Sequence, residues 1–123
     1  MEDQEVITLI AKYTVGLIDE IQAKLKILNN SHNGMNYLVL TELYSLRTRT
    51  YILAHESHFF QLDQQISKAV VTSSFQIFKA KITTMEDLLS LKKTVFLISM
   101  LISSIGVGEI ETTLEILSKL ESL

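Results

Sequence analysis

The chain has 123 residues, of which 47% are hydrophobic and 20% charged, and its formal net charge is -3 at pH 7. This length fits one domain, residues 1–123, and the apolar content is sufficient for a core, which excludes extended disorder. The absence of cysteine excludes disulfides, thiolate nucleophiles and zinc–cysteine sites. The net negative charge argues against nucleic-acid binding by the whole surface.

The N-terminus and the hydropathy indicate where the protein works. Glu2, Asp3 and Glu5 stand where a secretory signal would carry positive charge, and a cysteine-free chain suits a reducing compartment. We therefore expect a cytoplasmic protein. The mean hydropathy of +0.27 is high for a small soluble chain. It indicates that some apolar surface is shared with a partner or with another copy.

The first predicted element is an amphipathic helix over residues 3–28. Gly16 inside it suggests a close crossing by another helix, because glycine weakens a helix by about 1 kcal/mol relative to alanine. Residues 29–34, rich in Asn and Gly, predict a loop, so the first two helices should be antiparallel. The helix prediction rests on apolar residues spaced three and four apart: Ile7, Ile10, Leu17, Ile21, Leu25 and Leu28.

The second predicted helix, residues 36–64, carries two different rows of side chains. One is an apolar stripe that must be buried, formed by Val39, Leu43, Leu46, Leu53 and Phe60. The other lies roughly a quarter turn away and combines tyrosines and histidines with an arginine. Its members are Tyr37, Tyr44, Arg47, Tyr51, His55 and His58.

The segment after Gln64 admits two predictions, since neither Gly nor Pro separates the second helix from the helical stripe of residues 66–82. Asp63 could cap a new helix after a tight corner. Alternatively, residues 36–82 form one helix of more than forty residues. Such a rod would need oligomerisation to bury both of its stripes.

Two more helices are predicted in the last third of the chain. Thr83 and Glu86 match a capping box, which places the start of a helix there. This helix is apolar nearly all round, and residues 94–108 are uncharged but span only about 22 Å against about 30 Å of hydrocarbon. We expect it to be buried in the protein and not to span a membrane. Gly106 and Gly108 end it, and residues 109–123 form a short last helix.

Together these patterns predict an all-α fold, a four- or five-helix bundle that is mostly antiparallel and that oligomerisation could complete. The side chains indicate no cofactor and no catalytic residues. His55 and His58 lie three apart in a helix, but two ligands do not make a metal site, so we assign no metal. His32, Glu56 or Asp63 would have to complete such a site.

Arg49 and His55 have five residues between them. This spacing resembles the Arg-x4-6-His motif of HEPN ribonucleases, small all-α proteins that pair two such motifs across a dimer. The resemblance covers seven residues and implies that Arg49 stabilises the scissile phosphate while His55 acts in acid–base chemistry. The chain departs from the motif in having Thr50 after the arginine and in placing the motif inside a long helix.

The tyrosine and histidine row is the main candidate site. Tyrosine combines an apolar ring with a polar tip, which suits protein interfaces, although the same side chains could simply border the core with their hydroxyls in water. We therefore predict a non-enzymatic protein whose partner is itself or another protein. The interface would be this row of six side chains or the excess apolar surface of residues 95–105.

The alternative function is weak binding of single-stranded nucleic acid, with tyrosines stacking on bases and basic side chains neutralising phosphates. The HEPN-like ribonuclease is a further alternative. The basic residues available for the first are Arg47, Arg49, Lys68, Lys79 and Lys81.

Overall fold

The computed structural model describes residues 2–31 and 35–123, and over these ranges it confirms the all-α prediction. Five α-helices and one 3-10 turn are present there, without a strand. Their bounds are α1 Glu2–Ser31, α2 Met35–His55, η1 Ser57–Phe59, α3 Lys68–Thr84, α4 Leu88–Gly106 and α5 Ile110–Glu121.

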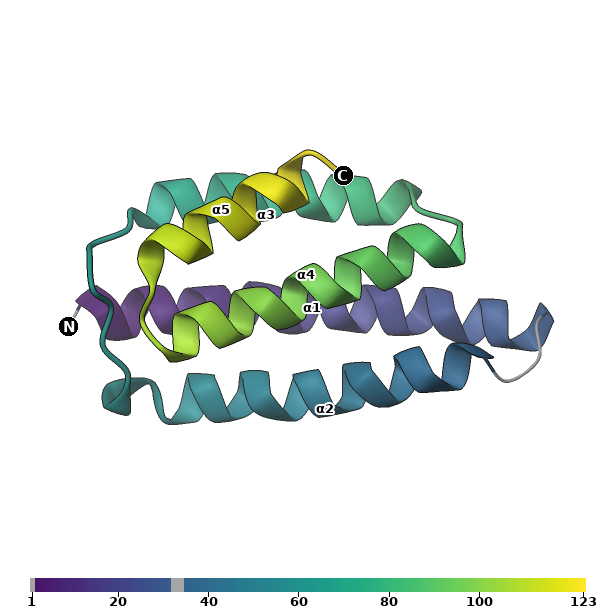
Figure 1. The fold of residues 1–123 in the computed structure, drawn as a ribbon, viewed down its shortest axis with the longest axis horizontal. Coiled ribbons are helices and arrows are strands. Elements are labelled where there is room, and N and C mark those ends of the chain that lie inside the picture. Colours follow the sequence, from purple (N-terminus) through teal and green to yellow (C-terminus); the bar gives the residue numbers. More distant parts are fainter. Residues whose placement is uncertain (1, 32–34) are drawn as a thin grey trace.

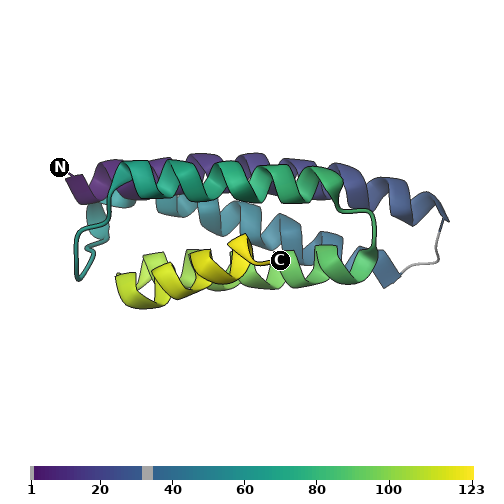
Figure 2. The same cartoon turned by 90° about the horizontal axis from the view of Figure 1, so that it is seen from above.

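The helices alternate in direction along the chain, so that α1, α3 and α5 run one way and α2 and α4 run the other (Figure 1). In Figure 2, which views the bundle from above, α3 and α1 lie along the upper side of the picture and α5 and α4 along the lower side. Helix α1 packs against α2, α3 and α4, and α5 packs against α3 and α4. The main neighbours of α2 are α1 and α4, so α2 forms one edge of the bundle.

The core follows the helical stripes predicted from spacing. On α1 the predicted positions Ile7, Ile10, Ile21 and Leu25 are fully buried. On α2 the stripe is buried from Val39 to Leu53. Burial of such apolar side chains contributes roughly 1.5–3 kcal/mol each, which explains why the stripes, and not weaker local preferences, orient the helices.

Helix α4 is covered mainly by its own chain. Eight of its residues are buried, and Leu97 and Met100 pack partly against the core. Between Val95 and Ile105, Phe96 is the exposed large hydrophobic side chain. The apolar excess of this segment is therefore largely absorbed by neighbouring helices. By length and hydropathy α4 also meets the criteria for a membrane span, and 44% of that apolar window is buried inside the bundle.

The second helix is shorter than the predicted residues 36–64, because α2 ends at His55. Of the two alternatives for residues 36–82, the continuous helix is therefore wrong. The chain then passes through η1 and an extended stretch before α3 begins. Two backbone groups in this stretch find distant partners. The Leu62 N–H donates to the Asp3 carboxylate at 3.2 Å, and the Asp63 N–H donates to the Gly108 carbonyl at 2.9 Å. These hydrogen bonds pair backbone groups that would otherwise be paired within a helix. The chain can therefore leave the helical conformation after His55.

Asp63 caps a helix, but not the one that follows it in sequence. Its Oδ1 accepts a hydrogen bond from the N–H of Ile110, the first residue of α5, at 3.0 Å. The N-cap of α3 is Ser67, whose hydroxyl accepts from the Ala69 N–H at 3.1 Å. An acidic side chain at the start of α5 also complements the helix dipole.

The capping box predicted at Thr83 is likewise wrong. Thr83 lies in the last turn of α3, where its hydroxyl donates to the Lys79 carbonyl and to Glu20 of α1. The N-cap of α4 is Asp87, whose carboxylate accepts from the Ser90 N–H at 2.9 Å. Asp has the same local capping chemistry as Thr, and the tertiary position of the chain selects between them.

Two expectations for the first helix also change. Residues 29–31, predicted as loop, are the last residues of α1, and residues 32–34 lie outside the described residues. Gly16 does not mark a close crossing, because an added Cβ there would meet nothing within 4 Å. It instead lines an open hollow between α1 and α3.

Candidate functional site

The predicted tyrosine row lies on the outer face of α2. The side chains of Tyr37, Tyr44 and Tyr51 are exposed, and so is His55 at the end of the helix. Thr41 and Thr48 stand between them on the same face, and each hydroxyl donates to the carbonyl of the tyrosine four residues earlier. Between Tyr37 and Tyr51 the tyrosines and threonines of this face carry no charge, and the threonine hydroxyl protons are already used within the helix.

Arg47 differs from the other members because it is held by α1. Its guanidinium forms an ion pair with Asp19 and donates to the Gln22 side chain at 3.3 Å. It also lies 6.0 Å from the centre of the Tyr51 ring, which in turn stacks near His55. Tyr51 and Asp19 together raise the pKa of Arg47. The contacts with α1 thus hold the charged guanidinium beside the Tyr51 ring.

His58 does not share the face of the other five predicted residues. It lies on η1, beyond the end of α2, and its ring packs against Phe59 with 4.2 Å between centroids. His55 and His58 are therefore not three apart on one continuous helix. Within residues 2–31 and 35–123, no group of three or more His, Asp or Glu side chains is arranged to hold a metal ion, and His32 lies outside these ranges.

The residues of the two alternative functions lie apart. Arg49 donates to the Ser99 hydroxyl of α4 at 3.0 Å, whereas His55 stacks near Tyr51, and six positions place the two about 120° apart around a helix. The basic set is divided between α2 and α3, on opposite sides of α1 in Figure 1. Lys68 pairs with Glu5, and Lys81 donates to the Leu123 carbonyl.

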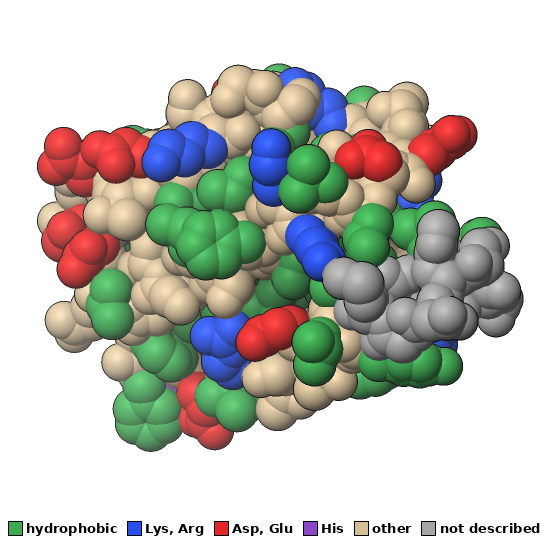
Figure 3. Space-filling model, turned by 45° about the vertical axis from the view of Figure 1, so that its right-hand side comes forward, with side chains coloured by type: hydrophobic (Ala, Val, Ile, Leu, Met, Phe, Trp, Pro, Cys, Tyr) green, Lys and Arg blue, Asp and Glu red, His purple; other side chains and the backbone are tan. Residues whose placement is uncertain are grey.

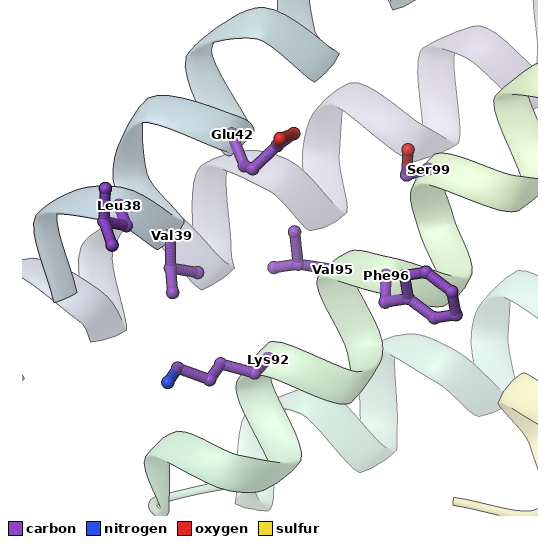
Figure 4. Close-up of a pocket in the computed structure, with 7 residues that line it drawn as sticks. All are labelled: Leu38, Val39, Glu42, Lys92, Val95, Phe96 and Ser99. Atoms are coloured by element: carbon purple, nitrogen blue, oxygen red, sulfur yellow. The ribbon is translucent and has the colours of Figure 1, made fainter. Parts of the chain in front are cut away.

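A second surface feature, not predicted from the sequence, is a groove between α2 and α4. It has a volume of about 470 Å³, and Figure 4 shows Val39 and Val95 facing one another between its two walls. Leu38 and Phe96 line it as well, with exposed fractions of 78% and 66%. Such exposure of two large apolar side chains beside a hollow is typical of a binding surface.

The groove also carries one charge of each sign. Glu42 stands on the α2 wall and Lys92 on the α4 wall, and Ser99 completes the lining (Figure 4). No ion pair joins the two charged groups, and neither pairs with another described residue. The face drawn in Figure 3 has separate areas of hydrophobic side chains with acidic and basic groups between them.

Sequence reasoning missed the groove because it treated each helix alone. Leu38 and Glu42 fall four apart, in a row that Ser45 and Ile52 continue beside the tyrosines, and this row was hidden by the more conspicuous aromatic pattern. Phe96 lies off the main stripe of α4, which was the available signal that it faces outward. Which helices border each other could not be read from either pattern.

Comparison with known proteins gives no further guide. No family model, no curated protein and no solved structure matches the chain.

Proposed function

We propose that the protein acts without catalysis, by association through helix faces, as a homo-oligomer or as a small subunit of a larger assembly. One observation carries this proposal. Of the fourteen exposed large hydrophobic side chains in the described residues, five lie on the 21-residue helix α2: Tyr37, Leu38, Tyr44, Tyr51 and Ile52.

The position of α2 strengthens the proposal. It is an edge helix whose inner stripe is buried against α1 and α4, so its outer side chains are not needed by the core. The outer face contributes few charges, since Glu42, Arg49 and the partly buried Arg47 are the ionised side chains between Tyr37 and Tyr51. Tyrosine and scarce charge are features of protein interfaces.

The first test is size-exclusion chromatography with light scattering, from about 1 to about 100 μM protein, where interfaces of moderate affinity dissociate. We expect a defined oligomer that loses mass on dilution. The ratio of nucleic-acid to protein absorbance, recorded in the same run, tests the alternative, and it is sensitive because the chain has no Trp. A monomer that carries nucleic acid released by salt would replace the proposal with the nucleic-acid function.

The variant Tyr44→Ser, Tyr51→Ser examines the tyrosine row. Both side chains are exposed, so the helical content should not change, and the assembly mass falls if this row forms the interface. A matched control is Thr48→Ser, which alters the same face without removing an aromatic ring. Unchanged mass in the double variant would show that the interface lies elsewhere on the helix faces.

A further inference from the structure

We propose that the groove between α2 and α4 binds the same groove of a second copy, in a two-fold dimer whose axis runs along the helices. This inference rests on the proposed function, because it names the partner and the surface of the association. It concerns the groove wall residues Leu38, Glu42, Lys92 and Phe96.

The first argument is that the groove is self-complementary. A two-fold interface uses one patch on both copies, so the patch must contain both partners of each contact. This groove contains a hollow between Val39 and Val95, and an exposed aromatic ring, Phe96, at its border. It also contains one carboxylate and one ammonium group without ion-pair partners among the described residues. Each copy thus supplies both partners of each contact, the hollow and the ring as well as the carboxylate and the ammonium group.

The second argument concerns the direction of the axis. Helices α2 and α4 run in the same direction, and Glu42 and Lys92 stand on opposite walls of the groove (Figures 1 and 4). A two-fold along the helices keeps each level of the groove and exchanges the walls. The α2 wall of one copy then faces the α4 wall of the other, so the wall that carries Glu42 in each copy faces the wall that carries Lys92 in its partner.

The other face-to-face arrangement is disfavoured by the same charges. A two-fold through the middle of the groove but across the helices would set α2 against α2 and α4 against α4. Glu42 would then approach a second Glu42, and Lys92 a second Lys92. Like charges brought together at an interface are destabilising, so electrostatics selects the axis that runs along the helices.

The apolar contacts agree with this arrangement. With the walls exchanged, Phe96 on the α4 wall of one copy meets the α2 wall of its partner, where Leu38 is exposed. An exposed phenyl ring that enters a hollow of this kind is the type of side chain that dominates interface energies. Removing it should therefore weaken the dimer more than removing an equally exposed ring elsewhere.

The decisive experiment uses two charge reversals, Glu42→Lys and Lys92→Glu, at low ionic strength. Each variant alone sets like charges against each other twice in the dimer, so its dissociation constant should rise about tenfold or more. An equimolar mixture of the two variants restores both attractive pairs. Analytical ultracentrifugation should then show a heterodimer that neither variant forms with itself.

A second pair of variants keeps the inference testable if charges contribute little. Phe96→Ser should raise the dissociation constant at least about tenfold, whereas Phe59→Ser, which removes a 74% exposed phenyl ring on η1, should leave it unchanged. Circular dichroism checks that both variants keep the helical content of the parent chain.

The outcomes separate this inference from the proposed function. A third sample is the chain that carries both reversals, Glu42→Lys and Lys92→Glu. Recovery in this chain but not in the mixture of the two single variants would mean that Glu42 and Lys92 interact within one chain, which overturns the inference. An oligomer unaffected by Phe96→Ser and by both reversals would overturn it too, while leaving association through another face. A wild-type chain that stays monomeric at every concentration would contradict self-association itself.

Discussion

The bundle has two pairs of neighbouring parallel helices, α1 with α3 and α2 with α4. The side-chain contacts between the two helices differ from one pair to the other. Four side-chain hydrogen bonds join α1 to α3 in the described residues, through Tyr13–Thr72, Lys24–Thr83, Glu5–Lys68 and Glu20–Thr83. Between α2 and α4 the corresponding bond is Arg49 to Ser99. The first boundary is thus joined by several polar contacts between its helices, and the second by one.

The hollows along the two boundaries differ in the same sense. The one between α1 and α3 measures about 310 Å³, and Lys12, Glu20 and Lys79 surround it. The one between α2 and α4 measures about 470 Å³, and its lining is mostly apolar, with Glu42 and Lys92 as its charged residues. Charged rims keep a hollow hydrated at little cost, whereas an apolar groove gains free energy when a partner covers it. The comparison therefore supports the second boundary as the surface of the association that we propose.

Gly108→Ala, in the turn between α4 and α5, should have the largest effect on stability. Gly108 has a φ of +77°, and an added Cβ would lie 2.0 Å from the Gln61 carbonyl oxygen. The substitution thus combines backbone strain with a backbone clash, and we expect a loss of more than about 3 kcal/mol in the free energy of unfolding. Urea denaturation measures it, and a loss below about 1 kcal/mol would contradict this geometry.

The boundary between α1 and α3 is tested by Lys24→Met. The Lys24 ammonium donates to the carbonyls of Thr83 and Met85 at 3.0 and 2.8 Å, at the C-terminal end of α3. Losing both bonds should cost about 1.5 kcal/mol. In the matched change at the boundary between α2 and α4, Arg49→Met, we expect a cost below about 0.5 kcal/mol, since one exposed hydrogen bond is lost. Equal costs in urea denaturation would remove the distinction between the two boundaries.

Gly16→Ala tests the boundary between α1 and α3 by a change that we expect to stabilise the protein. An added Cβ meets nothing within 4 Å, and Gly16 is helical, so the change should raise the free energy of unfolding by about 1 kcal/mol. Thermal denaturation is a sufficient measurement. A loss of stability would show that α1 and α3 approach more closely than the structure indicates.

The smallest expected effect is on pH dependence. The Ser90 N–H and hydroxyl hold the pKa of Asp87 below its usual value, and the Lys68 ammonium does the same for the pKa of Glu5. A carboxyl with a lowered folded-state pKa contributes stability above its unfolded pKa, and this contribution is lost as the pH falls through the folded-state pKa.

Asp87→Asn keeps a capping side chain at α4 without a titrating group, so stability should fall less steeply below about pH 4 than in the parent chain. Glu5→Gln is the matched variant at the boundary between α1 and α3. It should also make the stability fall less steeply at acidic pH. Urea midpoints between neutral and acidic pH measure both. Acid limbs identical to that of the parent chain would contradict the assigned causes.

The candidate site was predicted in part. Spacing alone placed Tyr37, Tyr44 and Tyr51 on one row of a helix, and the structure shows these side chains exposed on α2. Arg47 was grouped with them, but its ion pair with Asp19 ties it to α1. The groove could not be predicted, because its two walls come from helices whose adjacency no local pattern encodes.

By itself the sequence determined that the chain is helical and which stripe of each helix is buried, because apolar spacing at three and four residues acts within a single helix. Tertiary structure alone decided where the helices end and which faces stay open. The Asp63 carboxylate accepts a hydrogen bond from the N–H of Ile110, 47 residues away in the sequence. The end of α2 depends on such distant partners. A backbone group is satisfied by whatever lies near it in space, which sequence separation does not reveal.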